Sequence, residues 1–260
     1  MEKNLNFLDR NEFNYSPSKE VVEALKNFDI NKLCFYTRIY DEGKKSILSV
    51  FLSELYDIDE TQVLLGYGGE EDELLAEVPS QTVVLIDEAY ASFVSTDTSY
   101  IKKLVNKYPN LIISRTLSKF YGLPGLRMGF GFMSKELEKF SRYSNKYLGY
   151  NRISEDIAIA ALKSDAHYRN IAKLMNEDRE RYEKEIGVLP GFKVYESVAN
   201  FILIKYPIEL KEALQKAFAE QSYKVKFMNE PDINTHLRIT LGRPEQNRIV
   251  IDTIKEIASK

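Results

Sequence analysis

The sequence has little cysteine and little histidine, which limits the chemistry that it can support. Cys34 is the only cysteine among 260 residues, so a disulfide within the chain is excluded. His167 and His236 are the only histidines and lie far apart in the sequence. We therefore expect no metal cage of histidine and cysteine, and no metal site is predicted.

Long apolar runs and an excess of positive charge are also missing. The N-terminal MEKNLNFLDRNEF lacks the apolar core of a signal peptide, and no apolar run approaches the length that spans a bilayer. The net charge of -3 indicates neither nucleic-acid binding nor attraction to a membrane surface. We expect a soluble cytoplasmic protein with no nucleic-acid or membrane partner.

Short apolar segments alternate with amphipathic helical segments over the first 150 residues. Strands are predicted at 63–65, 83–86, 111–113 and 129–133, and helices at 19–28, 44–56, 70–78 and 99–107. This alternation indicates an α/β fold with a mainly parallel sheet sandwiched by helices.

The C-terminal part has a different pattern. A charged block at 154–186 predicts one long surface helix, and the tail predicts strands at 198–205 and 237–241 with a closing helix at 245–258. This order favours a smaller α+β domain. We divide the chain into an N-terminal arm (1–35), a large domain (36–150) and a small domain that includes the long connecting helix (151–260).

Three polar clusters follow predicted strands, where ligands bind in open parallel sheets. The clusters are 66–70, 87–90 and 114–119, and Arg127 follows one loop later. Backbone N–H groups of the first cluster suit a phosphate, although such glycine turns are also ordinary connectors. Thr116, Ser118 and Arg127 can donate hydrogen bonds to the same phosphate, or they form a polar loop with an exposed arginine.

Asp87 ends a buried strand, where a carboxylate is costly without a partner. An ordinary partner would be a helix N-terminus or Arg115; a functional one would be the protonated ring nitrogen of a cofactor. Tyr90 offers a phenol at the same rim, and Lys119 offers an amine. A phosphate, a protonated pyridine and an amine together indicate pyridoxal 5'-phosphate.

Several segments resemble fold-type I pyridoxal-phosphate aminotransferases, most closely the histidinol-phosphate aminotransferases. VVLIDEAYASF (83–93) is similar to the family's D-E-A-Y segment, SRTLSKFYGLPGLRMGF (114–130) to R-T-L-S-K-x-x-G-L-x-G-L-R, and LRITLG (237–242) to L-R-I-T-x-G. YDEGKKSIL (40–48) and ANFIL (199–203) match more weakly. The resemblance implies the pyridoxal-phosphate-dependent transferase fold over nearly the whole chain.

The resemblance also implies roles for individual residues. Lys119 would form the Schiff base and move the proton between substrate and cofactor, Asp87 would bind the pyridinium nitrogen, and Tyr90 would bind the ring hydroxyl. The phosphate would be held by the backbone amides of Gly69 and Glu70 and by Thr116, Ser118 and Arg127. Tyr40 would reach the phosphate of the neighbouring subunit's cofactor. Arg238 would bind the substrate carboxylate, supported by Asn200. A homodimer with a shared active site follows from the role of Tyr40.

The activity that this resemblance implies is transfer of an amino group from an amino acid or amino phosphate to a 2-oxo acid such as 2-oxoglutarate, in amino-acid biosynthesis. The family's N-P-x-x-P-T-G motif and its ring-stacking aromatic residue are absent between the glycine loop and Asp87, so the large domain is shortened near residues 70–80. Either the sequence lacks a segment of the protein, or the cofactor pocket is reduced.

Three other interpretations stay open. The first is a related decarboxylase of a phosphorylated amino acid. The second is a shortened, non-catalytic relative that binds the cofactor. The third is an unrelated α/β nucleotide-binding domain in which Lys119 is an exposed surface residue, although the joint order of the motifs argues against it.

Overall fold

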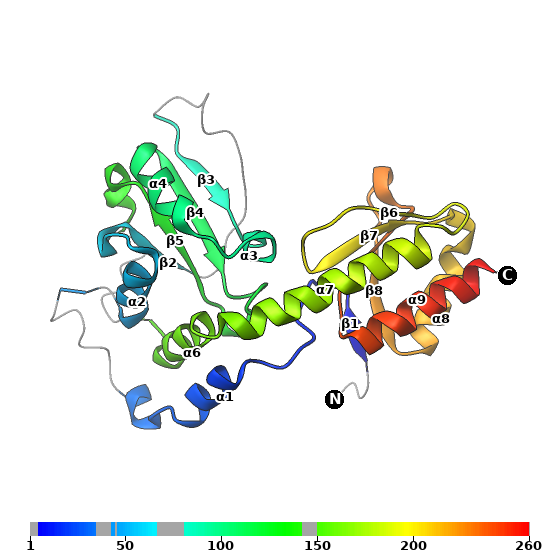
Figure 1. Ribbon diagram of the computed structural model, residues 1–260, viewed down its shortest axis with the longest axis horizontal. Helices are drawn as coiled ribbons and strands as arrows, with labels where there is room; N and C mark the ends of the chain where they lie inside the picture. The colour runs from blue at the N-terminus through cyan, green and yellow to red at the C-terminus, as the bar shows by residue number, and fades with distance from the viewer. Residues whose placement is uncertain (1–4, 35–42, 45, 67–80, 142–149, 260) are drawn as a thin grey trace. The chain divides into compact units, whose positions relative to one another are not determined.

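The structure is a computed structural model that describes residues 5–34, 43–44, 46–66, 81–141 and 150–259 (Figure 1). The chain forms two compact units. The central unit is Pro17–His167, and the terminal unit joins Met1–Ser16 to Tyr168–Lys260. The assignment of residues 1–35, 36–150 and 151–260 to domains stays a prediction, and the predicted helix at 70–78 lies outside the described residues.

A mixed four-stranded sheet forms the middle of the central unit. Its strands are β2 (Val63–Gly66), β3 (Val84–Asp87), β4 (Leu111–Thr116) and β5 (Gly129–Met133), in the order β2-β5-β4-β3. Strands β3 and β4 are parallel, whereas β5 is antiparallel to both β4 and β2. The α/β class is confirmed, but the described sheet is mixed where a mainly parallel one was predicted. Residues 117–128 form a turn and a short 3-10 helix instead of the crossover helix that a parallel return needs.

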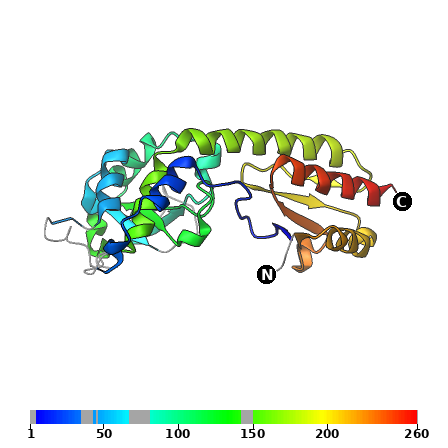
Figure 2. The same cartoon turned by 90° about the horizontal axis from the view of Figure 1, so that it is seen from below.

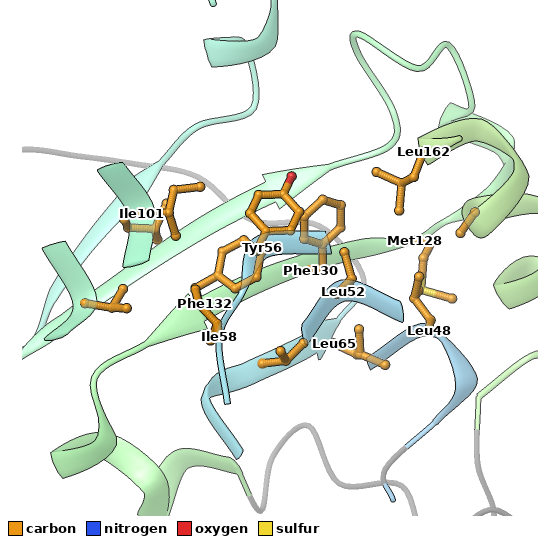
Figure 3. Packing of buried hydrophobic residues seen from close by; sticks show 14 of the residues in the cluster. Leu48, Leu52, Tyr56, Ile58, Leu65, Ile101, Met128, Phe130, Phe132 and Leu162 are labelled. Carbon is orange, nitrogen blue, oxygen red and sulfur yellow. The ribbon is translucent and has the colours of Figure 1, made fainter. Parts of the chain in front are cut away.

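The alternation of side chains along β4 gives this sheet two different faces. Leu111 and Ile113 are buried on one face, whereas Ser114 and Thr116 are half-buried on the other. The buried face packs against helices α2 (Ile47–Tyr56) and α4 (Ser99–Lys107). Figure 3 shows this core, which includes Leu48, Leu52, Tyr56, Ile101, Phe130 and Phe132. The apolar face therefore stabilises the unit, while polar residues gather on the other face.

Local sequence explains where α2 begins and ends. The Ser46 hydroxyl accepts a hydrogen bond from the Ser49 N–H at 3.0 Å, and the Ser49 hydroxyl accepts one from the Ser46 N–H at 3.0 Å. This reciprocal capping satisfies N–H groups at the helix start. The helix ends at Tyr56, and the next residue, Asp57, adopts a left-handed conformation. The other α-helices described within this unit are α1 (Lys19–Lys26), α3 (Ala91–Val94) and α6 (Arg152–Leu162).

The predicted block at 154–186 is two helices, so the prediction of one long helix is wrong. α6 ends at Leu162, and α7 covers Asp165–Ile186. Between them, the Ser164 hydroxyl lies 2.7 Å from the carbonyl oxygen of Ala160 and 2.8 Å from the hydroxyl of Ser18. Serine hydroxyls compete for backbone hydrogen bonds in this way, which favours a helix break.

The terminal unit is built on a five-stranded sheet in the order β1-β8-β9-β7-β6. Its strands are β1 (Asn6–Leu8), β6 (Lys193–Val194), β7 (Phe201–Lys205), β8 (Tyr223–Phe227) and β9 (His236–Thr240). In addition to α7, its helices are α8 (Lys211–Glu220) and α9 (Pro244–Ala258). Figure 2 shows α7 and α9 side by side, where Arg248 of α9 donates to Glu185 of α7. The predicted α+β character is confirmed, although β1, β6 and β8 were missed. None of the described helices is both long and apolar enough to span a membrane.

Gly242, two residues after β9, is held by the Asn247 side chain of α9. Its N–H donates to Asn247 Oδ1 at 2.9 Å, and Asn247 Nδ2 donates to the Gly242 carbonyl at 2.8 Å and to Asp178 Oδ2 at 2.7 Å. A Cβ atom at Gly242 would lie 2.8 Å from Gln246 Oε1 and 3.0 Å from Leu8 Cδ2. A side chain at this position would therefore have to displace Gln246 or Leu8.

We expect Gly242→Ala to lower the free energy of unfolding by about 1–3 kcal/mol, because the added methyl group overpacks this turn. Gly125→Ala is the control, since a Cβ there meets no atom within 4 Å, and it should change stability by less than about 0.5 kcal/mol. Urea unfolding of the two variants checks the difference. Equal stabilities would show that the turn after β9 adjusts without cost.

Glu155 of α6 is a buried carboxylate, 2% exposed, that reaches the start of α2. It accepts hydrogen bonds from the Ser46 hydroxyl and the Leu48 N–H, while its Oε1 has no hydrogen-bond partner among the described residues. Burial raises the pKa of Glu155, and the two hydrogen bonds oppose this rise only in part. Its ionised form is therefore less favourable in the folded chain than in the unfolded one.

We expect Glu155→Gln to remove a pH dependence of stability. Because burial raises the folded-state pKa of Glu155 above its ordinary value of 4.5, the folded chain binds the proton more tightly. The wild-type free energy of unfolding should therefore fall as the pH rises from 4.5 through the folded pKa. Urea unfolding at a series of pH values should show the variant gaining stability relative to wild type over that window. Glu138→Gln, at an exposed position of the same unit, is the control. A Glu155→Gln profile parallel to wild type would contradict the expectation.

Candidate active site

Asp87 is the last residue of β3 and lies beside Ser114 of the parallel strand β4. Its Oδ1 accepts hydrogen bonds from the Ala89 N–H at 2.7 Å and from the Ser114 hydroxyl at 3.3 Å. The side chain is half-buried. The structure thus places this predicted residue at the carboxyl end of a parallel pair, where ligands of such sheets bind.

The proposed ordinary partner Arg115 does not form its ion pair with Asp87; it forms one with Glu88. Arg115 Nη2 and Nε donate to Glu88 Oε2 at 2.7 and 2.9 Å. Because successive residues of a strand point to opposite faces, Glu88 and Arg115 lie on the core face, and Asp87 lies with Ser114 on the other face. The sequence analysis missed this ion pair because nothing local in the sequence marks it.

Lys119 lies in a turn that is anchored by two buried neighbours. Leu117 is fully buried and Phe120 is 2% exposed, whereas Lys119 is half-buried. The Lys119 carbonyl accepts a hydrogen bond from the Gly122 N–H at 3.1 Å, and Gly122 has a φ of 62°, which glycine adopts without strain. The Leu117 N–H also donates to the Met128 carbonyl at 3.2 Å. The apolar anchors hold the turn and leave the lysine side chain at the rim.

Tyr90 contacts Lys119 and follows shortly after Asp87 in the chain. Its ring centroid lies 5.7 Å from Lys119 Nζ, within the range of a cation–π contact. Tyr90 follows Asp87 by three residues and precedes the short helix α3, whose Phe93 contacts Phe120 at a ring distance of 5.2 Å. An acid, a phenol and an amine are therefore positioned by two strand ends and one aromatic cluster.

The predicted phosphate ligands differ in their positions and contacts. Thr116 and Ser118 are close, with their hydroxyl oxygens 3.0 Å apart and the Ser118 N–H donating to Thr116 Oγ1 at 3.1 Å. Arg127 is exposed, and its Nη1 donates to the Pro124 carbonyl at 3.1 Å. Tyr40, Gly69 and Glu70 lie outside the described residues.

Two glycines of β5 form part of the polar face, which the sequence analysis did not recognise. Gly129 lies opposite Thr116 and Gly131 lies opposite Ser114. A Cβ atom at Gly131 would approach the Ile113 carbonyl oxygen to 2.7 Å. Strand β5 therefore presents no side chain beside the two hydroxyls. The G-F-G-F alternation was the available signal, since it places glycine on one face and phenylalanine on the other.

Tyr100 completes the buried polar network around Arg115. Its hydroxyl donates to Glu88 Oε1 at 2.6 Å and accepts from Arg115 Nη2 at 3.0 Å. Burial and the hydrogen bond to Glu88 raise the pKa of Tyr100 to about 12. Burial alone would lower the pKa of Arg115, but the neighbouring Tyr56 and Glu88 raise it. The guanidinium therefore stays protonated, and the Glu88 carboxylate balances its charge within the core face.

The predicted substrate residues Arg238 and Asn200 belong to the terminal unit. Arg238 Nη2 donates to the Asp9 carbonyl at 2.9 Å, while its buried Nε has no hydrogen-bond partner among the described residues. Asn200 is fully buried, and its Nδ2 donates to the Asn11 carbonyl at 3.0 Å. Asn200 thus binds the same N-terminal segment as Arg238 and forms no described hydrogen bond with Arg238 itself.

A metal centre receives no support from residues 5–34, 43–44, 46–66, 81–141 and 150–259. No group of three or more histidine, cysteine, aspartate or glutamate side chains within these ranges could hold a metal ion. The polar groups around Lys119 are hydroxyls, a phenol and one carboxylate. This set suits an organic ligand that carries both a cationic ring and an anionic group.

We expect Leu117→Ala to lower the free energy of unfolding by about 2–5 kcal/mol, because it leaves a cavity beneath the lysine turn. Leu55→Ala removes the same atoms from a side chain that is 48% exposed, and it should cost less than about 1 kcal/mol. Chemical denaturation compares the two. A small effect at position 117 would mean that the turn is not anchored by this side chain.

Comparison with known proteins gives the family of this fold. Residues 70–254 match the family described as aminotransferase class I and II. Histidinol-phosphate aminotransferase from Roseiflexus castenholzii is 34% identical over 180 residues, which cover 68% of this chain and 47% of that relative. The chain spans about half the length of the curated relatives that it matches.

Solved structures show the same fold at low sequence identity. Histidinol-phosphate aminotransferase from Sinorhizobium meliloti, in complex with pyridoxal-5'-phosphate, superposes with a TM-score of 0.79 at 16% identity, covering 98% of this chain and 91% of that one. The enzyme of the same name from Clostridium acetobutylicum gives a TM-score of 0.78 at 15% identity, covering 98% and 99%. Because the family match covers most of its length, this chain belongs to the aminotransferase class I and II family.

Proposed function

We propose that the protein is a pyridoxal-phosphate-dependent aminotransferase, similar to histidinol-phosphate aminotransferases, that moves an amino group between an amino acid or amino phosphate and a 2-oxo acid such as 2-oxoglutarate. The observation that carries the proposal is the placement of Asp87, Tyr90 and Lys119 at one end of the parallel pair β3–β4. Membership of the aminotransferase family supports it independently.

The described residues fit pyridoxal phosphate. The Asp87 carboxylate, a partner for a cationic ring nitrogen, lies on the same sheet face as Gly129 and Gly131, which carry no side chains. The hydroxyls of Thr116 and Ser118 lie at the end of the same strand and can donate to a phosphate. When bound, the cofactor supplies an aldehyde for the amino group and a ring that accepts electrons.

Each residue at this rim would have a distinct task. Lys119 would hold the cofactor through Nζ and carry the proton to and from the substrate carbon. Asp87 would pair with the ring nitrogen and keep it protonated, and Tyr90 would donate to the ring oxygen. Arg127, Thr116 and the predicted backbone amides of Gly69 and Glu70 would bind the phosphate.

Arg238 would bind the carboxylate of the substrate. A guanidinium pairs with a carboxylate through two parallel hydrogen bonds, and Arg238 has a buried Nε without a described partner. Asn200 would act indirectly, because it holds the Asn11 carbonyl two residues after Asp9, whose carbonyl binds Arg238.

The assembly and cellular role are part of the same proposal. We infer a homodimer in which Tyr40 reaches the phosphate bound by the neighbouring subunit. We also infer a cytoplasmic role in amino-acid biosynthesis, which is supported by relatives named histidinol-phosphate aminotransferase.

We expect the purified protein with added pyridoxal phosphate to show a visible absorption band, and sodium borohydride to fix the cofactor covalently on Lys119. Lys119→Ala should abolish both and lower the rate of amino transfer by at least about 10²–10⁴-fold, since it removes the acid–base group. Absorption spectra, and mass spectrometry of peptides after reduction, provide the measurement. Lys103→Ala, at an exposed helix position, is the control and should behave as wild type.

The same preparation separates the alternatives. An aminotransferase loses its visible band with an amino donor and recovers it with 2-oxoglutarate. A decarboxylase would instead release carbon dioxide from a phosphorylated amino acid, and a non-catalytic relative would keep its band with either addition. A wild-type protein that stays colourless with excess cofactor would refute the proposal.

A further inference from the structure

A buried ion pair joins the ends of β3 and β4 on the face opposite the proposed cofactor. The side chains of Arg115 and Glu88 are 5% and 11% exposed, and two guanidinium nitrogens bond to one carboxylate oxygen. Tyr100 bonds to both partners, and the hydroxyl of Ser92 in α3 lies 3.4 Å from Arg115 Nη1. The network therefore ties both strand ends to α3 and α4.

Each partner of this pair is a direct chain neighbour of a residue in the proposed site. Glu88 follows Asp87, and Arg115 stands between Ser114 and Thr116. The Glu88 N–H also donates to the Ser114 carbonyl at 2.8 Å, which continues the parallel ladder past Asp87. The buried ion pair therefore lies only one residue along each strand from the side chains that would face the cofactor.

Electrostatics makes this proximity important. In a partly desolvated interior, an unneutralised cation lowers the affinity of a nearby carboxylate for another cation. Arg115 without Glu88 would be such a cation at the same end of the sheet as Asp87, on the opposite face. With Glu88 in contact, the pair adds almost no net charge to the sheet end.

We propose that Glu88 is a positioning residue of the cofactor site, which neutralises Arg115 on one face of the sheet and so preserves the negative potential of Asp87 for a cationic ring nitrogen on the other. This inference rests on the proposed function. Glu88 touches neither substrate nor cofactor, so its effect passes through Arg115 and Asp87. The effect depends on the ring nitrogen, and that dependence allows a direct test.

Two probes isolate the ring nitrogen. Pyridoxal phosphate carries it, and 1-deazapyridoxal phosphate has a C–H group in its place. The preference for the first over the second, measured as a ratio of dissociation constants by equilibrium titration, reports the strength of the contact with Asp87. Wild type is expected to prefer pyridoxal phosphate by about ten- to hundredfold, the usual effect of one charge-assisted hydrogen bond.

Two variants break the same ion pair but leave different charges. Glu88→Gln keeps the volume of the side chain and leaves Arg115 without a counter-charge, so the preference should fall by about tenfold. Arg115→Met leaves no cation near Asp87, and the remaining Glu88 carboxyl is either protonated or adds negative potential, so the preference should not fall more than about threefold below wild type. A purely structural ion pair would affect both variants and both probes equally, because it has no dependence on the ring nitrogen.

The outcomes separate the two proposals. A preference that falls in Glu88→Gln and persists in Arg115→Met supports the inference. Equal preferences in the two variants, or loss of preference in Arg115→Met, would overturn it while leaving the proposed function intact. If Glu88→Gln does not fold, loss of the preference in Arg115→Met would still overturn the inference. A wild-type protein that binds neither probe would overturn the proposed function, and this inference with it.

Discussion

The parallel register of β3 and β4 is the constraint on which the proposed site depends. It sets Asp87 opposite Ser114 and Glu88 beside the next residue of β4. Since side chains alternate along a strand, one register decides both that Asp87 faces the glycine surface of β5 and that Arg115 faces the core. A shift by one residue would exchange the two faces and bury Asp87 among apolar side chains.

Packing on the core face maintains this register. Leu111 and Ile113 are fully buried against α2 and α4, and Phe130 and Phe132 of β5 contact Tyr56 of α2. These contacts are apolar and make no use of the opposite face, where the chemistry is proposed. The sheet thus separates stability from binding, so that polar residues at the rim need not contribute to the core.

Motif and periodicity predicted the strand ends well but not the contacts between strands. The strand at 129–133, the helix at 99–107 and the location of Asp87, Tyr90 and Lys119 at the rim follow from local patterns, because apolar runs and turn residues are adjacent in sequence. The Glu88–Arg115 pair joins residues 27 positions apart, and no local pattern encodes it. The helix break at Ser164 was missed for the same reason, since part of its hydrogen bonding comes from Ser18 in α1's N-terminal cap.

Arg115 and Arg238 have different environments, which fit the different roles inferred for them. Arg115 is almost fully buried and donates to a carboxylate and a phenol, so its charge is neutralised within the fold. Arg238 is half-buried, donates one described hydrogen bond to a main-chain carbonyl, and forms no ion pair with any other described residue. A buried Nε without a partner is unfavourable in the isolated chain, and an incoming carboxylate would relieve that cost. The sequence places both arginines in family-like motifs, but only the contacts around them separate Arg115, whose charge is neutralised in the core, from Arg238, whose buried Nε has no described partner and for which we propose a carboxylate.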